Sequence, residues 1–376
     1  MSEYQRIAFR AIDSPVSEKN LEYMRRQSSR AEITPWSFDN EYHYGDFRGD
    51  ALEMLRRGYD FHLHYANFGI HKLLIRLPHG LLDSKAARPY LSEDSLQFLQ
   101  DKQGRGGTLS IDPYYEPGDL GELWELDILD RLVPLRAEIL DGDLRPLYLA
   151  HLAVACDGNH DPEETKEAPV PAGLEKLSAA QRALAEFYGL GDSLIAAAAR
   201  DAPPLAAPTD PRNQYTEWLR GQPEATKDTW LAQWLTDPHS IGRGEILAEF
   251  RESHRAPLWP AVRRDRTIAE LKATAEEIQL EADRNKAANA ARQRAKRLAG
   301  MAADPAQTLR ETEKLVTQRS REAYRQIAML LAELRGALAG SSQSGLAEEQ
   351  ARKLKNQNPT LRLLISELRR EGFLPK

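Results

Sequence analysis

The sequence is poor in cysteine: Cys156 is the only one among its 376 residues. One cysteine can form neither a disulfide within the chain nor the cysteine pairs of a structural zinc site. The first residues lack the long apolar run of a secretory signal, and no uninterrupted apolar stretch approaches the ~20 residues that span a bilayer. We therefore expect a cytoplasmic protein without a membrane segment.

Recognisable catalytic motifs are missing too. The sequence contains no Walker pattern, no Gly-x-Ser-x-Gly and no His-Glu-x-x-His. Gly104, Gly106 and Gly107 do not open a helix, so they predict a hairpin turn and not a phosphate-binding loop. Cys156 lies in an apolar run, which is typical of a buried thiol. No catalytic residue, metal ligand or cofactor follows from these patterns, and an enzyme is the less favoured class.

Strand and helix signals alternate within the first 80 residues. Phe61, Leu63 and Tyr65 follow the two-residue spacing of a half-buried strand, whereas Leu21 and Met24 follow helical spacing. The predicted order is β-α-β-β-α-β with one further strand, which is the order of a ferredoxin-like α+β sandwich. Strands are expected at 4–12, 31–38, 41–47, 61–68 and 73–77, and helices at 18–28 and 51–57.

The remainder of the chain divides by composition. Residues 1–156 are expected to form the α+β domain, in which 81–156 elaborate the core of 1–80. Residues 157–173 are acidic, proline-rich and without large apolar side chains, which predicts a linker. Helical periodicity predicts a helical domain over 174–261 and a helical bundle over 262–376, where the heptad spacing of 268–282 favours a coiled coil.

The net charge of −6 conceals an asymmetry between an acidic body and a basic C-terminal part. Residues 262–376 hold 23 Lys or Arg against 15 Asp or Glu, and the preceding residues hold 28 against 42. Such an asymmetry favours an electrostatic interaction at the basic end.

Two charged stretches are candidate interaction sites. The basic stretch could contact phosphates, although its interleaved alanines offer no aromatic ring for base stacking, or it could be a solvated helix face. The acidic stretch could dock a basic partner, perform acid–base chemistry, hold a divalent cation or form a solvated face. The basic residues are Arg284, Lys286, Arg292, Arg294, Lys296 and Arg297, and the acidic residues are Asp112, Glu116, Asp119, Glu122, Glu125, Asp127 and Asp130.

Two further clusters involve histidine and tryptophan. His62 and His64 have the spacing that places both side chains on one face of a strand, either as part of a metal site or as half-buried residues without metal. Four of the six tryptophans lie between residues 218 and 259, which predicts either a small core or a docking face.

Short motifs near both ends of the chain resemble those of known bacterial families. The N-terminal motifs are Ser2-Glu3-Tyr4-Gln5 with Phe9, Ala11-Ile12-Asp13 and Pro15, then Arg30-Ala31-Glu32-Ile33-Thr34-Pro35, Gly45-Asp46-Phe47 and Gly49-Asp50. They resemble an uncharacterised group of bacterial proteins. The C-terminal motifs, with Arg294, Leu298, Ala299, Tyr324, Leu330-Leu331, Leu334-Arg335 and Phe373-Leu374, are similar to the helical tail of bacterial SWIM zinc-finger proteins. The resemblance implies kinship without an activity, because the metal motif of SWIM proteins is absent here.

We expect a non-enzymatic interaction or scaffold protein of a bacterial multi-component assembly, which binds protein partners, or further copies of itself, through its helical half. The first alternative is a nucleic-acid-associated protein that uses the basic helix at 284–297. A weaker alternative is a metal-dependent hydrolase that uses His62, His64 and nearby acids.

Overall fold

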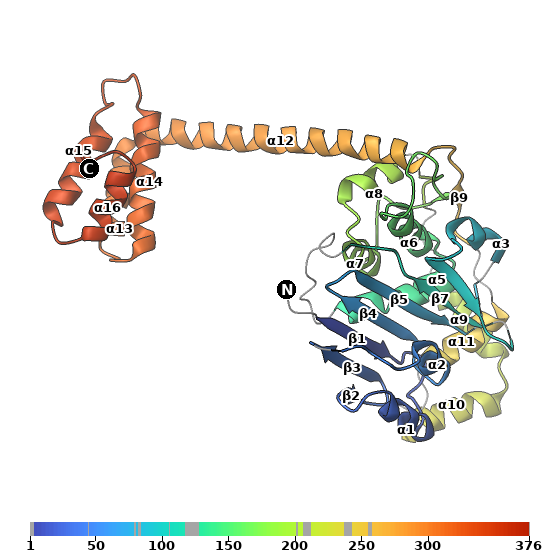
Figure 1. The fold of residues 1–376 in the computed structure, drawn as a ribbon. Coiled ribbons are helices and arrows are strands. Elements are labelled where there is room, and N and C mark those ends of the chain that lie inside the picture. Colours follow the sequence, from blue (N-terminus) through green and yellow to red (C-terminus); the bar gives the residue numbers. More distant parts are fainter. Residues whose placement is uncertain are drawn as a thin grey trace. The chain divides into compact units, whose positions relative to one another are not determined.

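The computed structural model describes residues 4–43, 45–78, 80, 81, 84–104, 106–116, 128–200, 202–205, 212–236, 243–254 and 258–375. The chain forms two compact units, residues 1–279 and 280–376. The first contains a sheet and helices, and the second is helical (Figure 1). The predicted combination of a mixed N-terminal part with a helical C-terminal part is confirmed at this level.

An antiparallel sheet of seven strands organises the first unit. Its order is β2-β3-β1-β4-β5-β7-β6, and every neighbouring pair is antiparallel. The strands are β1 (Gln5–Arg10), β2 (Glu32–Ile33), β3 (Ser37–Tyr42), β4 (Phe61–Ala66), β5 (Ile70–Leu77), β6 (Leu96–Gln100) and β7 (Gly107–Ile111).

The strands of this sheet carry apolar side chains on both faces. Along β1, Ile7 and Phe9 pack into one core, whereas Ala8 between them packs into another. Along β5, Leu74 lies in the first core and Leu73 and Ile75 lie in the second. This alternation follows from the two-residue period of a strand, and it requires a covering layer on each side of the sheet.

Helices α1 (Glu18–Gln27) and α2 (Ala51–Arg56) cover the first face. Leu21 and Met24 of α1 are buried there, and the Asp50 side chain caps α2 by accepting a hydrogen bond from the Glu53 amide at 2.9 Å. The strand predicted at 31–38 is reduced to the two residues of β2, because the chain turns around Pro35 and β3 begins at Ser37.

Helices from the middle of the chain cover the second face. Leu132, Tyr148 and Phe187 from this layer share one core with Leu63 and Ile75 of the sheet. The other elements of the first unit that precede α12 are α3 (Ser84–Ala87), the 3-10 helix η1 (Arg88–Tyr90), α4 (Ile128–Leu132), α5 (Leu135–Leu140), α6 (Arg145–Ala155), β8 (Val170–Pro171), α7 (Ala179–Phe187), α8 (Asp192–Ala199), α9 (Arg212–Gly221), α10 (Glu224–Thr236), α11 (Arg243–Ser253) and β9 (Ala261–Val262).

The sequence predicts a linker between two domains at 157–173, whereas part of this segment is packed within the first unit. Ala168, Val170 and Ala172 of that segment are buried, and β8 pairs with β9. Residues 167–173 therefore belong to the packed interior, residues 158–166 are exposed or half-buried, and the whole segment lies within the first unit and does not separate two domains. Helices at 174–200 are drawn into the same unit because the second apolar face of the sheet needs a cover.

Helix α12 (Ile268–Ala303) crosses from the first unit into the second. Ile268, Leu271 and Ala275 pack in the core of the first unit, so the start of the predicted heptad seam is used within this chain. Residues 281–297 of the same helix are exposed.

The second unit is a helical bundle around Ile327, Leu331 and Leu334 of α14, which are fully buried. Asp304 and Ser320 cap α13 and α14 by accepting backbone hydrogen bonds from Gln307 and Ala323. With the end of α12, the bundle consists of α13 (Pro305–Val316), α14 (Arg321–Ala337), α15 (Leu346–Gln357) and α16 (Arg362–Arg370).

Leu334→Ala is expected to lower the unfolding free energy of the second unit by about 2–5 kcal/mol, because it leaves a cavity in a closed core. Met329→Ala on the same helix is the control, since Met329 is 51% exposed. Denaturation followed by far-UV circular dichroism measures the loss. Tryptophan fluorescence reports on residues 1–279 alone, because all six tryptophans lie there, and its transition should not move. Equal effects of the two substitutions would contradict the assigned core.

Candidate functional site

Three helices of the first unit, α9, α10 and α11, form an apolar groove with a volume of about 740 Å³. Each helix contributes large apolar or aromatic side chains at the spacing of one helical face. The lining residues are Tyr215, Trp218, Leu219, Lys227, Trp230, Leu231, Trp234, Ile246, Leu247 and Phe250.

Stacked aromatic rings form the floor of this groove. Trp218 and Phe250 are buried, and their rings meet edge to face at 5.5 Å between centroids. Trp218 also stacks on Trp230 at 5.7 Å, and Tyr215 meets Phe250 at 4.7 Å. Because each helix supplies at least one of these rings, the ring contacts hold the three helices together and give the groove a fixed shape.

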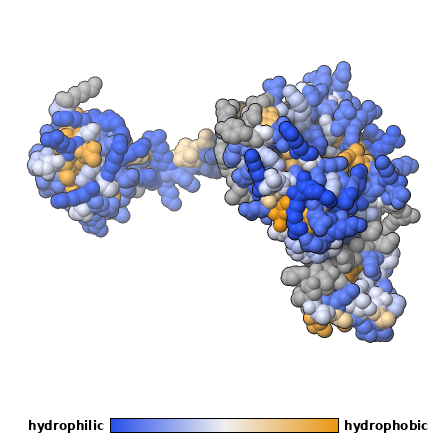
Figure 2. Space-filling view, turned by 60° about the horizontal axis from the view of Figure 1, so that its bottom comes forward, coloured by the Kyte–Doolittle hydropathy of each residue, from blue (hydrophilic) through white to orange (hydrophobic). Residues whose placement is uncertain are grey.

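The rim of the groove exposes apolar side chains that a folded chain normally covers. Leu231 and Trp234 are each 57% exposed, Leu235 is 77% exposed and Leu219 is 38% exposed. Apolar groups also interrupt the mostly hydrophilic surface in the space-filling view (Figure 2). A contiguous patch of this kind is typical of a protein-binding surface.

The local sequence explains how the groove arises. Pro223 precedes α10 and accepts the first-turn hydrogen bond from the Thr226 amide at 3.0 Å. Arg251 of α11 pairs with Asp141 at 2.8 Å, which ties this helix to the end of α5. Of the two alternatives predicted for the tryptophan cluster, the small core is present at Trp218, while α10 leaves apolar side chains exposed.

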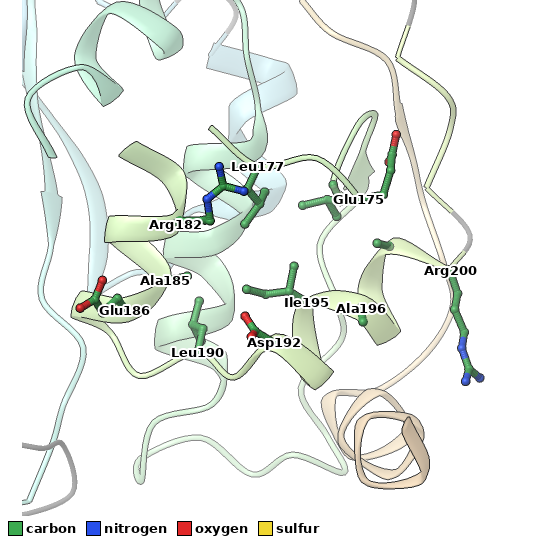
Figure 3. A pocket seen from close by; sticks show the side chains of 12 residues that line it. Glu175, Leu177, Arg182, Ala185, Glu186, Leu190, Asp192, Ile195, Ala196 and Arg200 are labelled. Atoms are coloured by element: carbon green, nitrogen blue, oxygen red, sulfur yellow. The ribbon is translucent and has the colours of Figure 1, made fainter. Parts of the chain in front are cut away.

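A second cavity of about 660 Å³ lies between α7, α8 and residues 174–177 (Figure 3). Leu177, Leu190 and Ile195 line its apolar part, while Arg200 points away from it. Glu186 at its edge pairs with Arg131 at 2.6 Å. The lining residues offer no buried polar side chain that would fix the orientation of a ligand, so the cavity is the weaker candidate.

His62 and His64 lie on β4, but each is engaged within the sheet. The His62 ring stacks on Phe9 at 4.1 Å, and its Nδ1 lies 3.1 Å from the Ala8 carbonyl oxygen. The His64 Nε2 lies 3.1 Å from the side-chain oxygen of Gln5. Burial lowers the pKa of His62 to about 3 and that of His64 to about 4, so both rings are neutral at physiological pH.

Buried charges in the first unit neutralise one another. The Arg136 guanidinium donates to both carboxylate oxygens of Asp13 and lies 3.3 Å from Asp60, whose pKa is raised mainly by burial. Arg145 pairs with Asp143 at 2.7 Å. These ion pairs hold α5 and the start of α6 in place within the first unit.

The predicted acidic stretch is only partly described. Asp112 pairs with Lys72, and Asp130 pairs with Arg10, each at 2.7 Å, so both carboxylates serve the first unit itself. Glu116 also lies among the described residues, whereas Asp119, Glu122, Glu125 and Asp127 lie outside them.

The predicted basic residues lie together on α12, and all six are exposed. They are Arg284, Lys286, Arg292, Arg294, Lys296 and Arg297. Of these six, only Arg297 has an ion-pair partner among the described residues, Glu333 at 2.7 Å.

Comparisons of the chain with protein-family models, with curated proteins and with solved structures find no match. Within the described ranges, no group of three or more His, Cys, Asp or Glu side chains is placed to hold a metal ion. None of the helices in those ranges is long and apolar enough to cross a membrane.

His71 is a buried histidine that the sequence did not single out. It is 4% exposed among Tyr65, Tyr115 and Phe187, and neither ring nitrogen has a hydrogen-bond partner among the described residues. Burial lowers its pKa to about 4. Between pH 6.5 and 4 the unfolded chain therefore takes up a proton that the folded chain does not, and stability falls as the pH falls.

His71→Phe is expected to remove this pH-dependent loss of stability, which is about 3 kcal/mol at full extent. Tryptophan-detected denaturation at pH 7 and pH 5 should show a smaller loss of stability for the variant than for the wild type. His43→Gln, which removes an exposed histidine, is the control and should follow the wild type. If the loss is the same in His71→Phe, His71 does not cause the acid sensitivity.

Proposed function

We propose that this protein is a non-enzymatic interaction protein that assembles through its helical half, and that the groove of α9–α11 is its protein-binding surface. The observation that carries the proposal is the exposure of Leu231, Trp234 and Leu235 beside a preformed aromatic floor. Exposing such side chains to water costs free energy that a partner recovers by covering them.

The occupant that we propose is α10 of a second copy of this chain. Lys227, Trp230, Leu231 and Trp234 repeat at three and four residues, which is the pattern of a helix that lies in an apolar groove. One element therefore carries both the groove wall and a projecting apolar edge, as the self-complementary surface of a two-fold dimer requires.

Charge also favours pairing of two copies. Residues 229–236 of α10 contain no charged side chain, so a contact centred on them brings no like charges together. Lys227 pairs with Glu224 of its own helix at 2.7 Å and adds little net charge at the rim. A small contact of this kind fits a dissociation constant on the order of micromolar.

We also propose a ferredoxin-like topology for the sheet and a cytoplasmic location for the protein. The order β2-β3-β1-β4, with α1 and α2 on one face, supports a ferredoxin-like core that β5, β7 and β6 extend. The single, partly buried Cys156, whose pKa is raised mainly by burial, supports a function in the reducing bacterial cytoplasm.

The test is the mass of the full-length protein in solution across a concentration series. Light scattering after gel filtration should show a monomer at low micromolar concentration and a dimer at higher concentration. Trp234→Glu should keep the protein monomeric throughout, because two like charges would meet in the contact.

Ala232→Glu provides the matched control, since it adds the same charge to the opposite face of α10 at an exposed position. It should dimerise as the wild type does, and circular dichroism should show both variants folded. A wild type that stays monomeric at every concentration, or a Trp234→Glu variant that still dimerises, excludes α10 of a second copy as the occupant.

A further inference from the structure

The exposed part of α12 concentrates positive charge. Residues 284–297 contain six Lys or Arg and no Asp or Glu. The whole second unit has the same sign, with 19 Lys or Arg against 11 Asp or Glu over residues 280–376. Of the six, Arg297 alone has an ion pair within the described part of the chain.

Helical geometry sorts this segment into two different faces. At about 100° per residue, Asn285, Asn289 and Gln293 share one face. The opposite side carries Ala287 and Ala291 together with Arg284 and Arg294. Arg292 and Lys286 lie about 60° to either side of the amide face. Lys296 lies within that face and Arg297 lies at its edge, so four of the six cations lie on or beside the amide face.

A face of side-chain amides flanked by cations fits the major groove of duplex DNA. A helix of about 10–12 Å diameter enters a groove about 12 Å wide, with the phosphates of both strands at its sides. Cations on both flanks would then meet both phosphate walls. Asn and Gln can form paired hydrogen bonds with the edge of adenine in that groove.

Other polyanionic partners fit these residues less well. Residues 281–297 contain no aromatic side chain on which single-stranded bases could stack. The major groove of duplex RNA is too deep and narrow for side chains to read. A membrane-surface helix needs large apolar side chains opposite its basic face, and here that side carries only Ala287, Ala291, Arg284 and Arg294.

We propose that residues 284–297 of α12 bind duplex DNA by lying in its major groove, with Lys286, Arg292, Lys296 and Arg297 on the phosphates and Asn285, Asn289 and Gln293 toward the bases. This binding does not depend on the groove of α9–α11. The proposals for these two surfaces can therefore be tested separately.

Fluorescence anisotropy of the full-length protein with a labelled duplex of about two helical turns tests the proposal. The logarithm of the binding constant should fall with the logarithm of salt concentration with a slope of about −3 to −4, as three or four phosphate contacts require. The combined variant Lys286→Gln, Arg292→Gln, Lys296→Gln and Arg297→Gln should lose at least tenfold in affinity at low salt and should flatten this slope.

The control removes four exposed cations elsewhere in the second unit. The variant Arg321→Gln, Arg325→Gln, Arg352→Gln and Arg362→Gln carries the same net charge as the test variant. It should keep most of the affinity and of the slope. An equal loss in the two variants would mean that bulk charge, and not the α12 face, attracts the DNA.

A third variant separates base contacts from phosphate contacts. Asn285→Ala with Asn289→Ala should leave the salt slope unchanged and should reduce, on the order of tenfold, the preference for the sequences selected from a random duplex pool. Absence of any preference in the wild type, or an unchanged preference in this variant, excludes the orientation of the amide face toward the bases.

Three outcomes overturn the DNA proposal as a whole. The first is no binding at micromolar protein in low salt. The second is equal affinity for single-stranded DNA or duplex RNA. The third is binding to anionic lipid vesicles, or to a peptide of residues 112–130, that is lost in the α12 variant while duplex DNA does not bind.

Discussion

The first unit depends on one buried carboxylate, that of Glu167. It is 3% exposed, and its two oxygens accept hydrogen bonds from the Arg266 guanidinium at 2.5 and 2.9 Å and from the Tyr148 hydroxyl. A charge taken out of water costs several kcal/mol unless a partner compensates it, so the pair must form together. It joins α6 and the segment before β8 to the segment before α12, which lies 99 residues beyond Glu167 in sequence. The helical layer and the start of α12 take their places from this contact.

The same contact shows why composition misled the domain prediction. Residues 157–173 are acidic and proline-rich, and such composition usually marks a solvated connection. Glu167 is nevertheless buried, because Arg266, 99 residues further along the chain, compensates its charge. Local patterns do predict β4 and the hairpin of β6 and β7, since the two-residue period and the glycine-rich turn are local signals. Pairings between distant residues leave no such local signal.

The candidate surfaces were predictable to different degrees. Clustered tryptophans pointed to α9–α11, but only the structure separates Trp218 in the floor from Trp234 on the rim. The sequence alone shows the six cations at 284–297, whereas the shared face of Asn285, Asn289 and Gln293 follows only from the uninterrupted helix. His71 gave no sequence signal, because a histidine alternating with apolar residues resembles any other half-buried strand position.

The edge strand β2 limits how copies of this protein can join. It has two residues, Glu32 and Ile33, and Pro35 follows closely. A strand this short presents almost no free backbone donors and acceptors to a neighbouring chain, which is a common protection against aggregation. Extension of the sheet from one molecule into the next is therefore closed at this edge. On this side of the sheet, association with another chain must therefore use side chains and not backbone pairing.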